Sequence, residues 1–398
     1  MIPITKALKI IARETPTLTS ERIDLASAVG RVLAEDLIAD TDLPPFDRSQ
    51  MDGYAVVAED TRNTPVELTL VGESAAGSGW HKIMKRGEAV RIMTGAPVPA
   101  GADAVQKVEL TSETVNGTVK ILEPTEKERF IIRLGSEIRK GKVVFKSGEV
   151  ITENMITAIA AFGYAKLKVG KRPRAAILST GSEIVEISKK PKRDQIRNSN
   201  SVMLDALCRK AGADPFILPI ARDDIDSLKA SIKAGVKKAD ILIITGGVSV
   251  GKYDHTKTAL TELGAEIFFD KVKLKPGKPA VFARLGKTLV FGLPGNPVSS
   301  AVTFSLFVRS AIMQLAGAGE VHLRSGFAML ARDVKGARER DTYLPVALET
   351  NKQGCLIATL LKWSGSSDFI GFARATALAI VPAGQSFAKD KPVSILFL

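Results

Sequence analysis

The chain has 398 residues, of which 45% are hydrophobic and 25% are charged, a composition typical of folded proteins that excludes disorder, collagen and a disulfide-dense mini-scaffold. At ~100–200 residues per domain, this length predicts about two to four domains. The 56 basic and 43 acidic side chains give a net charge of +13, which indicates an anionic partner such as nucleic acid, a membrane surface or a small polyanion.

The first 45 residues are predicted to be helical as far as the Leu-Pro-Pro break at 43–45. Their beginning places four apolar residues on one face of a helix: Ile4, Ala7, Leu8 and Ile11. This stretch lacks the apolar core and the small-residue cleavage site of a signal peptide. The chain has no continuous run of about 18 apolar residues, so we expect no membrane-spanning helix.

Residues 46–139 are rich in Gly, Pro, Thr and Val in short alternating runs, which is typical of β structure. A helix is predicted from Asn154 to Phe162, and Gly163 ends it. We expect residues 140–170 to pack on residues 1–45 as one helical linker part. Residues 46–139 would then be an inserted β-rich domain.

Residues 171–317 alternate between strands, loops and helices. Three continuous apolar runs, typical of strands buried on both faces of a sheet, each lead into a Gly-rich loop: 175–178 into 179–183, 240–244 into 245–251, and 289–291 into 292–297. Helices are predicted between the strands at about 199–211, 226–238 and 256–263. The pattern indicates a three-layer α/β domain with a mainly parallel sheet.

A last helix of this domain is predicted from 297 to 315. Asn296 is a suitable N-cap and Pro297 suits the first helical position, and Gly317 provides the stop. Residues 318–398 return to short β-like runs, which predicts a small C-terminal β domain. The predicted fold class is therefore multidomain α/β with additional β parts.

Cysteine, histidine and aromatic content limit the function further. Cys208 and Cys355 are too few for a metal quartet or a disulfide framework, and three histidines leave little room for a histidine-based metal site. A reducing cytoplasm fits this composition. Aromatic residues are only 6% and no nucleic-acid-binding motif is present, so neither a nucleic-acid nor a membrane partner is expected. The densest basic cluster, 189–193, is interpreted as a solvated loop.

The three Gly-rich loops predict an anion site. In parallel α/β sheets, ligands collect at the carboxyl ends of strands, where backbone N–H groups and helix N-termini bind anions. No loop matches the P-loop pattern, so ordinary NTPase chemistry is not supported. Glu183, Asp223 and Asp254 accompany the loops, and their hard oxygen ligands favour Mg²⁺ over zinc. Helix capping is the alternative for Asp223 or Asp224 alone.

The stretch 271–279, Lys-Val-Lys-Leu-Lys-Pro-Gly-Lys-Pro, is the most specific basic feature. Lys271, Lys273 and Lys275 would share one face of a strand, where their like charges repel and favour a bound anion. An edge strand guarded by lysines is the alternative. The Pro-Gly turn and Lys278 favour an oxyanion pocket.

A serine hydrolase is a weaker alternative. Residues 247–251 fit the GxSxG pattern of a nucleophile elbow around Ser249, and Asp270 and His322 follow in the chain order of a triad. However, His322 lies beyond the last α/β helix and no oxyanion motif precedes Ser249. This reading is therefore disfavoured.

Together these stretches resemble the molybdopterin molybdenumtransferase family, which includes the E domain of gephyrin. The resemblance covers about residues 46–300 and rests on ordered motifs at 47–55, 91–97, 179–183, 246–251 with Asp254, 275–279 and 292–297. It implies a helical linker part (1–45 and 140–170), an inserted β-rich domain (46–139), a molybdopterin-binding α/β domain (171–317) and a C-terminal β domain (318–398).

The resemblance also implies an elongated homodimer with an active site between subunits, which Asp52 and Thr94 would reach from the partner chain. The family inserts molybdate into adenylylated molybdopterin with Mg²⁺ and releases AMP, and the enzyme that adenylylates molybdopterin would be an upstream partner. Molybdate and tungstate are nearly the same size, so the residues leave both open. A scaffold protein built on the same fold is the alternative, and it is disfavoured because the acidic and basic site residues are present.

By resemblance, each candidate residue receives a role. Lys275 and Lys278 would hold molybdate, with Ser249, Ser299, Arg340 and one of Ser366 or Ser367. Glu183, Asp223 and Asp254 would position Mg²⁺ and the adenylyl phosphate. The remaining substrate-binding candidates come from the three loops: Thr180, Gly181, Gly246, Gly247, Gly251, Pro294, Asn296 and Pro297. Where the family usually has an acidic pair, this chain has Ser136 and Glu137.

Overall fold

The computed structural model describes residues 1–247, 255–362 and 365–398. The chain divides into two compact units. The first unit contains Met1–Glu35, Ser147–Glu153 and Lys166–Leu398, and the second contains Asp36–Lys146 and Asn154–Ala165. The finer division into four parts stays a prediction.

The first unit is built around a six-stranded sheet with the order β16-β13-β17-β21-β20-β18. The first four of these strands are parallel and the last two are antiparallel to their neighbours, which confirms the mainly parallel sheet. The strands are β13 (Arg174–Ser179), β16 (Asp214–Ile217), β17 (Ile241–Thr245), β18 (Glu266–Lys271), β20 (Pro279–Leu285) and β21 (Thr288–Leu293).

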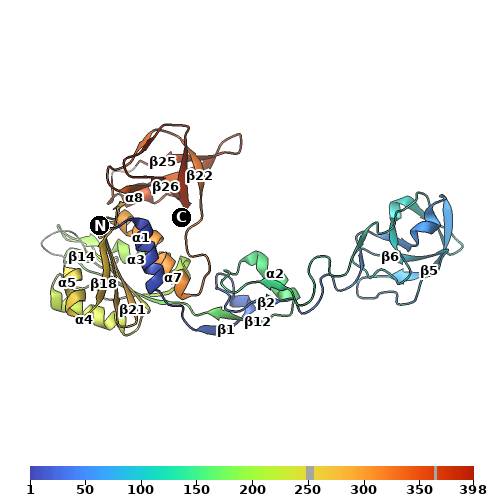
Figure 1. Ribbon diagram of the computed structural model, residues 1–398, viewed down its shortest axis with the longest axis horizontal. Coiled ribbons are helices and arrows are strands. Elements are labelled where there is room, and N and C mark those ends of the chain that lie inside the picture. The colour runs from blue at the N-terminus through green and yellow to red at the C-terminus, as the bar shows by residue number, and fades with distance from the viewer. Residues whose placement is uncertain (248–254, 363–364) are drawn as a thin grey trace. The chain divides into compact units, whose positions relative to one another are not determined.

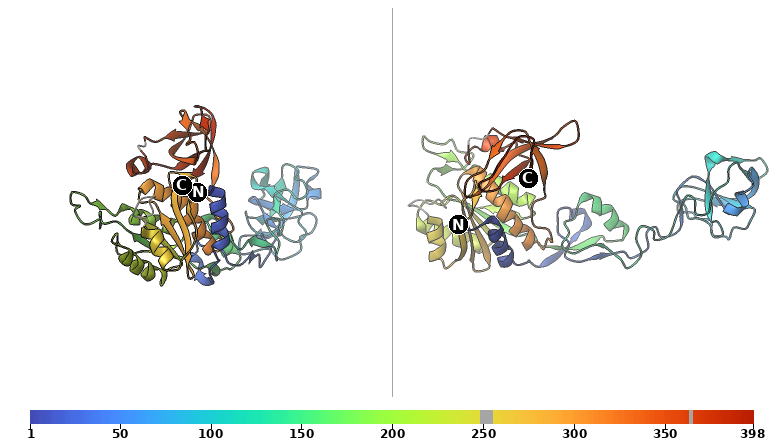
Figure 2. Two further views of the ribbon diagram at one scale, coloured as in Figure 1. Left: turned by 60° about the vertical axis from the view of Figure 1, so that its left-hand side comes forward. Right: turned by 45° about the horizontal axis from the view of Figure 1, so that its top comes forward.

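Helices cover both faces of this sheet, as Figures 1 and 2 show. The core on one face contains residues of α1, α3 and the 297–315 helix, and the core on the other contains residues of α4 and α5. The three-layer α/β prediction is therefore confirmed. The helices are α1 (Ile4–Glu14), α3 (Ser199–Lys210), α4 (Ile225–Val236), α5 (His255–Glu262), α6 (Pro297–Thr303) and α7 (Arg309–Leu315), with a π-helical turn, Phe304–Val308, joining the last two.

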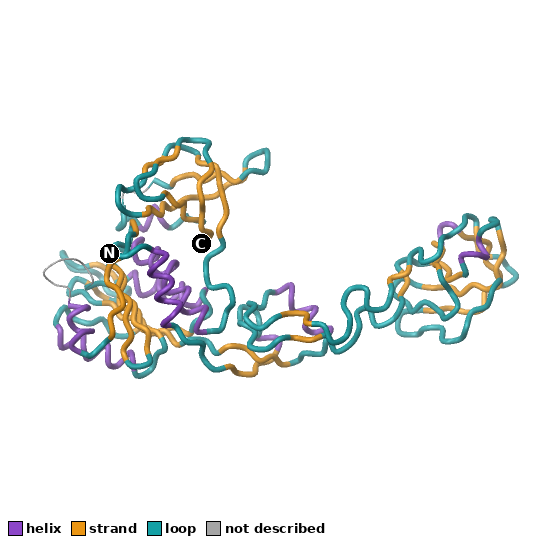
Figure 3. Tube along the Cα trace, viewed as in Figure 1, coloured by secondary structure: helices purple, strands orange, loops and turns teal. Residues whose placement is uncertain are grey.

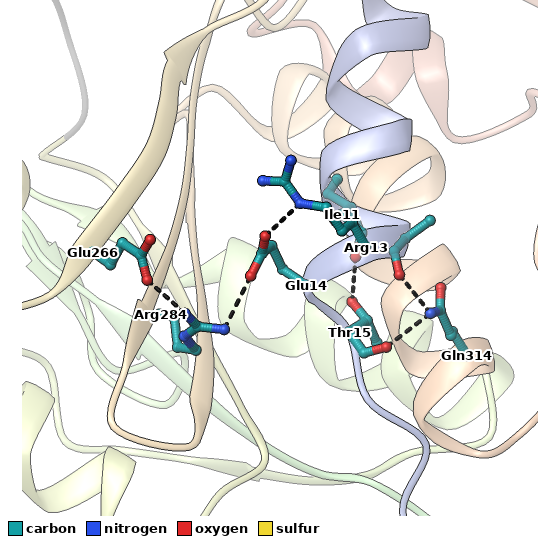
Figure 4. Close-up of polar contacts among 8 residues, drawn as sticks. Ile11, Arg13, Glu14, Thr15, Glu266, Arg284 and Gln314 are labelled. Carbon is teal, nitrogen blue, oxygen red and sulfur yellow. Dashed lines mark hydrogen bonds and ion pairs between the residues drawn. The ribbon is translucent and has the colours of Figure 1, made fainter.

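Helix α1 buries the apolar face that its sequence predicts, with Ile4, Ala7 and Ile11 in the core. The carbonyls at its end accept from the Gln314 side chain, at 2.7 Å from Ala12 O and 2.8 Å from Thr15 O (Figure 4). These bonds anchor α1 on α7.

The prediction that all of residues 1–45 are helical was wrong. After α1, the chain forms strand β1 (Ser20–Asp24), a 3₁₀ turn (Leu25–Ser27) and strand β2 (Leu37–Ile38). Strand β1 pairs antiparallel with β12 (Lys166–Gly170), so a partner distant in sequence decides its conformation. Local propensity is a weak guide where tertiary pairing is available.

The C-terminal part of the first unit is a small β barrel, mostly strands in Figure 3. The pairing β24-β25-β22-β28-β26 closes on itself through β24 and β26, and β19 of the α/β part adds to β24. This confirms the predicted β part. Besides the added strand β19 (Leu274–Lys275), its elements are β22 (Ser325–Leu330), β23 (Val334–Lys335), β24 (Asp341–Thr350), β25 (Leu356–Leu360), α8 (Phe369–Phe372), β26 (Ala377–Val381), β27 (Ser386–Phe387) and β28 (Pro392–Phe397).

The second unit is β-rich, as its sequence predicts. Its main sheet has the order β7-β4-β6-β5-β9-β8, and its apolar residues form two cores. The elements are β3 (Arg48–Ser49), β4 (Gly53–Val56), β5 (Val66–Ser74), β6 (Glu88–Ile92), β7 (Ala104–Lys107), β8 (Thr111–Glu113), β9 (Thr118–Ile121), β10 (Ile131–Ile132), β11 (Val143–Phe145) and α2 (Glu153–Ala161), with 3₁₀ turns at Ala58–Thr61 and Val108–Leu110.

The sequence was expected to contain no helix that could span a membrane. The 297–315 helix is nevertheless long and apolar enough to do so by its length and composition alone. However, 83% of its most apolar window is buried inside the structure. Packing in the core of the first unit explains this composition, because a helix that is apolar all round is buried in a core or in a membrane.

Candidate active site

A cavity of about 1280 Å³ lies at the carboxyl ends of β13, β17 and β21, where the Gly-rich loops begin. This is the place where open α/β sheets bind their ligands. The structure brings ten of the predicted site residues to its wall: Thr180, Gly181, Glu183, Asp223, Gly246, Gly247, Pro294, Asn296, Pro297 and Ser367.

Asp223 holds the first Gly-rich loop in place. Its Oδ1 accepts from Thr180 Oγ1 at 3.1 Å, and its Oδ2 accepts from the backbone N–H of Ser182 at 2.8 Å. Helix capping is done instead by its neighbour Asp224, whose Oδ1 accepts from Ser227 N at 2.7 Å. The carboxylate of Asp223 is thereby fixed at the cavity wall.

Glu183 lies close to the same loop. A Cβ added at Gly181 would come 2.6 Å from Glu183 Oε2, so glycine makes room for this carboxylate. Among the residues that the structure describes, the carboxylates at the cavity wall are those of Glu183 and Asp223.

The second loop packs tightly on the first. Gly246 has a φ of +96°, and a Cβ there would lie 2.4 Å from the carbonyl oxygen of Thr180. Its N–H donates to Leu293 O at 3.2 Å, at the start of the third loop. Only glycine permits this approach of the backbones, which explains the glycine predicted here.

Asn200, in the first turn of α3, is a wall residue that sequence reasoning missed. Its Nδ2 donates to Thr245 Oγ1 at 3.0 Å and to the carbonyl oxygen of Gly295 at 2.7 Å, so it joins the second and third loops. The only available signal was an Asn at a predicted helix start, where such residues are common caps. The capping residue is in fact Asn198, which accepts from Ser201 N.

Ser366 and Ser367, the two alternatives for the site serine, lie in different surroundings. Ser366 Oγ accepts from Asn296 Nδ2 at 2.9 Å, and its carbonyl accepts from Val298 N at 3.2 Å, so this residue supports the start of α6. Ser367 lines the cavity. Asn296 makes no side-chain cap bond, although it stands at the N-cap position with Pro297 after it as predicted.

The prediction that one strand carries the three lysines was wrong, because Lys271 ends β18, Lys275 lies in β19 and Lys273 lies between the two strands. Strand β18 ends at Lys271, and the chain leaves its pairing with β20 to join β24 through β19. Between the two strands, the backbone N–H of Lys273 donates to Ile2 O at 2.8 Å. Lys271, Lys273 and Lys275 still lie away from the core, since the residues between them are buried.

Lys275 of β19 lies near Arg340, which directly precedes β24. Lys275 lies opposite Thr342 in the β19–β24 pair, and Arg340 Nη1 lies 3.5 Å from Leu274 O. Neither cation lines the described part of the cavity wall, and the same holds for Lys278. The wall does include Pro279, the residue after Lys278.

Helix α6 connects the lysine turn with the cavity. A Cβ at Gly277 would come 2.6 Å from Thr303 Cγ2 of α6, whose first residue Pro297 lines the cavity. Ser299 is buried in this helix, and its carbonyl accepts from Thr303 Oγ1 at 2.7 Å. It is not among the described residues that line the cavity.

Asp52 and Thr94 form a pair within the second unit. Asp52 Oδ1 accepts from the backbone N–H of Thr94 at 2.6 Å and from its hydroxyl at 2.9 Å. These two bonds, the backbone one first, lower the pKa of Asp52 below its usual value. The carboxylate is exposed and stays ionised at neutral pH.

Three candidates, Ser249, Gly251 and Asp254, lie outside the described residues. Within the described ranges, no group of three or more His, Cys, Asp or Glu is placed to hold a metal ion. Glu183 and Asp223 nevertheless provide carboxylate oxygens at one wall, which is the ligand chemistry that Mg²⁺ prefers. The residues present fit a magnesium ion, and the site stays a prediction.

The serine hydrolase alternative loses support from Asp270. Lys257 Nζ donates to its Oδ2 at 2.6 Å, and this contact is the main reason that the pKa of Asp270 lies below its usual value. An orienting carboxylate would instead accept from a histidine.

Comparison with known proteins supports the resemblance noted in the sequence along nearly the whole chain. Three family models match: the MoeA N-terminal region (domains I and II) at residues 2–163, a probable molybdopterin binding domain at 176–314, and the MoeA C-terminal region (domain IV) at 328–398. Two crystal structures of molybdopterin biosynthesis MoeA protein from Pyrococcus horikoshii cover 100% of this chain and 99% and 100% of their own, with TM-scores of 0.81 and 0.86 at 32% and 29% identity.

Relatives with the name molybdopterin molybdenumtransferase cover nearly all of the chain. The protein from Staphylococcus aureus (strain COL) is 34% identical over 400 residues, 99% of this chain and 95% of its own length. The protein from Bacillus subtilis (strain 168) is 34% identical over 407 residues, 100% of this chain and 94% of its own. The chain therefore belongs to the molybdopterin molybdenumtransferase family of enzymes.

Proposed function

We propose that this enzyme inserts molybdate into adenylylated molybdopterin, with Mg²⁺ assisting the release of AMP. Family membership gives the chain a role in molybdenum cofactor biosynthesis, with molybdopterin and molybdate as substrates. The observation that carries the proposal is the cavity where three Gly-rich loops, Glu183 and Asp223 meet. Loops of this kind bind phosphates through backbone N–H groups, and the carboxylates suit a magnesium ion.

The chain's own residues would act as follows. The loops around Thr180, Gly246 and Pro294 would bind and orient the substrate's phosphoanhydride at the carboxyl ends of the strands. Glu183 and Asp223 would hold Mg²⁺, with Asp254 as a third ligand. Bound there, Mg²⁺ would neutralise charge on the phosphoanhydride.

Lys275, Lys278 and Arg340 would hold molybdate next to this site. Their cationic groups match a dianionic oxyanion, and Ser299 and Ser249 would add neutral donors. Positive charge held in position for an anion stabilises it more than water does, since the groups need no reorganisation.

The test of this function is the release of AMP by purified protein from adenylylated molybdopterin, Mg²⁺ and molybdate. We expect release that depends on molybdate and stops with EDTA. Release that is the same without any oxyanion would contradict molybdate insertion. Running tungstate in parallel decides which oxyanion is preferred.

We also propose a homodimer whose active site takes Asp52 and Thr94 from the partner subunit. Mixing two inactive variants, Asp52→Ala and Lys275→Ala, would then restore about a quarter of the sites, because half of the randomly mixed dimers contain one intact site. If each site is built from a single chain, the mixture stays inactive.

Two further expectations accompany this proposal. The enzyme that adenylylates molybdopterin is the expected upstream partner, since it makes the substrate. The cytoplasm is the expected compartment, and the two free cysteines fit it.

A further inference from the structure

We propose that a second cavity of the first unit, named here the α3–α8 pocket, binds a small organic anion with an apolar body, such as an aryl carboxylate or sulfonate. The pocket has a volume of about 630 Å³ and adjoins the larger cavity, with which it shares Ser199, Asn200, Pro297 and Phe369. Sites for small molecules are typically ~300–1,000 Å³ in volume. The inference is independent of the proposed function, which assigns the substrate to the larger cavity.

Large apolar side chains form most of the pocket wall. They come from α3, from the 297–315 helix and from the C-terminal part of the first unit, and they include Met203, Leu207, Phe304, Leu323, Phe372 and Phe397. Phe304 is buried, but the other five are only half-buried. An apolar ligand would therefore remove more of their surface from water, which favours binding.

Three cationic side chains also line the pocket: Lys210 of α3, Arg309 of α7 and Arg324 before β22. The side chains of the wall, as far as the structure describes it, include no carboxylate. None of the three cations has an ion pair within residues 1–247, 255–362 and 365–398. Like charges without counter-ions repel one another, so a bound anion would stabilise this arrangement.

Arg309 is held in a position to receive that anion. Its Nη1 donates to Val321 O at 2.8 Å, which fixes the guanidinium, whereas Nε and Nη2 have no partner in the described part of the chain. These two groups form the edge of an arginine that binds an oxyanion through two parallel N–H donors. Burial lowers the pKa of Arg309, and no carboxylate opposes this effect. A partly buried cation without a counter-ion is costly, and an anionic ligand would offset that cost.

The backbone of the pocket wall is unusual at the same place. Phe304 and Ser305 belong to the π-helical turn Phe304–Val308, and Arg309 follows it directly. Single π-helical turns inside α-helices are rare and occur frequently at functional sites. Because such a turn holds one more residue than an α-helical turn, it changes the direction in which Arg309 leaves the helix.

The combination of walls and charges selects the class of ligand. An inorganic oxyanion would pair with the cations but would leave the apolar side chains in contact with water. A neutral hydrocarbon would cover the apolar side chains but would leave partly buried cations without a counter-ion, which is unfavourable. A molecule with an apolar body and one anionic group satisfies both parts of the wall.

The experiment titrates the full chain with anilinonaphthalene sulfonate, an aryl sulfonate that fluoresces in apolar surroundings. Arg324→Gln removes an exposed cation from the pocket, and the matched control Arg197→Gln removes an exposed cation that lines only the larger cavity. We expect the Kd to rise about tenfold in Arg324→Gln, as for one lost charge-assisted bond, and to change less than about twofold in the control. An effect of the control as large as that of Arg324→Gln would overturn the inference.

A neutral analogue, phenylnaphthylamine, separates the ring from the charge. Its Kd should be unchanged in Arg324→Gln, and an equal loss of both probes there would overturn the role of the cations. Leu207→Gln should weaken both probes, provided that its thermal unfolding curve matches that of the parent. Val202→Gln is the control on the same helix, because Val202 is 46% exposed and does not line the pocket. Unchanged affinities in a folded Leu207→Gln variant would overturn the assignment of the pocket.

Sedimentation at increasing concentrations of the sulfonate tests whether a second copy of the chain occupies the pocket instead. We expect the mass of the protein to stay the same while the site saturates. Dissociation of an oligomer in proportion to the bound probe would overturn the inference, because the pocket would then be a contact between copies. None of these measurements uses AMP release, so they keep their meaning if the insertion reaction fails its own test.

Discussion

The side-chain amide of Asn200 donates to the carbonyl oxygen of Gly295 at 2.7 Å, which ties the first turn of α3 to the loop after β21. The same amide donates to Thr245 Oγ1 at 3.0 Å, and this hydroxyl donates to Pro294 O at 3.3 Å. Loops from two adjacent strands are therefore held together by one side chain. Their spacing decides where the backbone N–H groups of these two loops lie in the cavity.

We expect Asn200→Ala to lower kcat/KM for AMP release about tenfold or more, because small displacements of positioning groups are costly to a reaction. The variant should also lose about 1–3 kcal/mol of unfolding free energy, since two hydrogen bonds disappear. Steady-state kinetics and urea unfolding measure the two effects. The control is Asn351→Ala, because Asn351 Oδ1 holds a turn by accepting from Gln353 N and Cys355 N at 3.0 and 2.9 Å. Equal kinetic losses in both variants would contradict a positioning role.

The sheet and its loops were predictable because their signals are local. Continuous apolar runs such as 241–244 encode strands buried on both faces, and the glycines after them are required by close approach, as Gly246 shows. Asn200 was missed because an Asn at the start of a helix does not indicate which loops its side chain contacts. Strand β1 and the break in the lysine strand were missed because each depends on a distant partner, Lys166–Gly170 and Ile2.

We expect Lys275→Ala to raise the KM for molybdate about tenfold or more while the KM for adenylylated molybdopterin changes little. The reason is the loss of a charge next to an oxyanion, and charge-assisted bonds are about twice as strong as neutral ones. Kinetics with molybdate as the varied substrate measure this. Lys287→Ala is the matched control, because it removes an exposed lysine from the β20–β21 turn of the same sheet. A control effect as large as that of Lys275→Ala would point to net charge instead.

We expect Asp223→Asn to raise the Mg²⁺ concentration needed for half-maximal AMP release about tenfold. The amide oxygen can still accept from Thr180 Oγ1, but the negative charge for the metal is gone. Its NH₂ group would also face the Ser182 N–H, so the loop loses one bond. Asp224→Asn is the control, since Asp224 caps α4 and does not line the cavity. An unchanged Mg²⁺ requirement in Asp223→Asn would remove Asp223 from the metal site.

Asp52 should titrate below its usual range, as its two bonds from Thr94 lower its pKa. Because the folded-state pKa is depressed, the stabilisation is complete above the ordinary pKa and disappears as the pH falls through the lower folded-state value. Loss of activity on acidification near pH 5 is therefore not expected to come from Asp52. A ¹³C carboxyl titration measures this, with Asp52→Asn to assign the signal. In Thr94→Val the pKa should rise but stay below the ordinary value, because the backbone bond, the larger cause, remains. A return to the ordinary value would contradict that order.

Gln314→Ala should destabilise the first unit without changing the kinetics of the cavity. Gln314 Nε2 donates to Ala12 O at 2.7 Å and to Thr15 O at 2.8 Å. Both carbonyls lie at the end of α1, where backbone carbonyls have no donor within the helix. Their loss should lower the unfolding free energy by about 1–3 kcal/mol, as for a net loss of two hydrogen bonds. Gln385→Ala is the control, because this exposed side chain has no hydrogen bond within the described part of the chain. Hydrogen exchange should show faster opening of α1 in Gln314→Ala, whereas equal exchange in both variants would mean that packing of Ile4, Ala7 and Ile11 alone holds this helix.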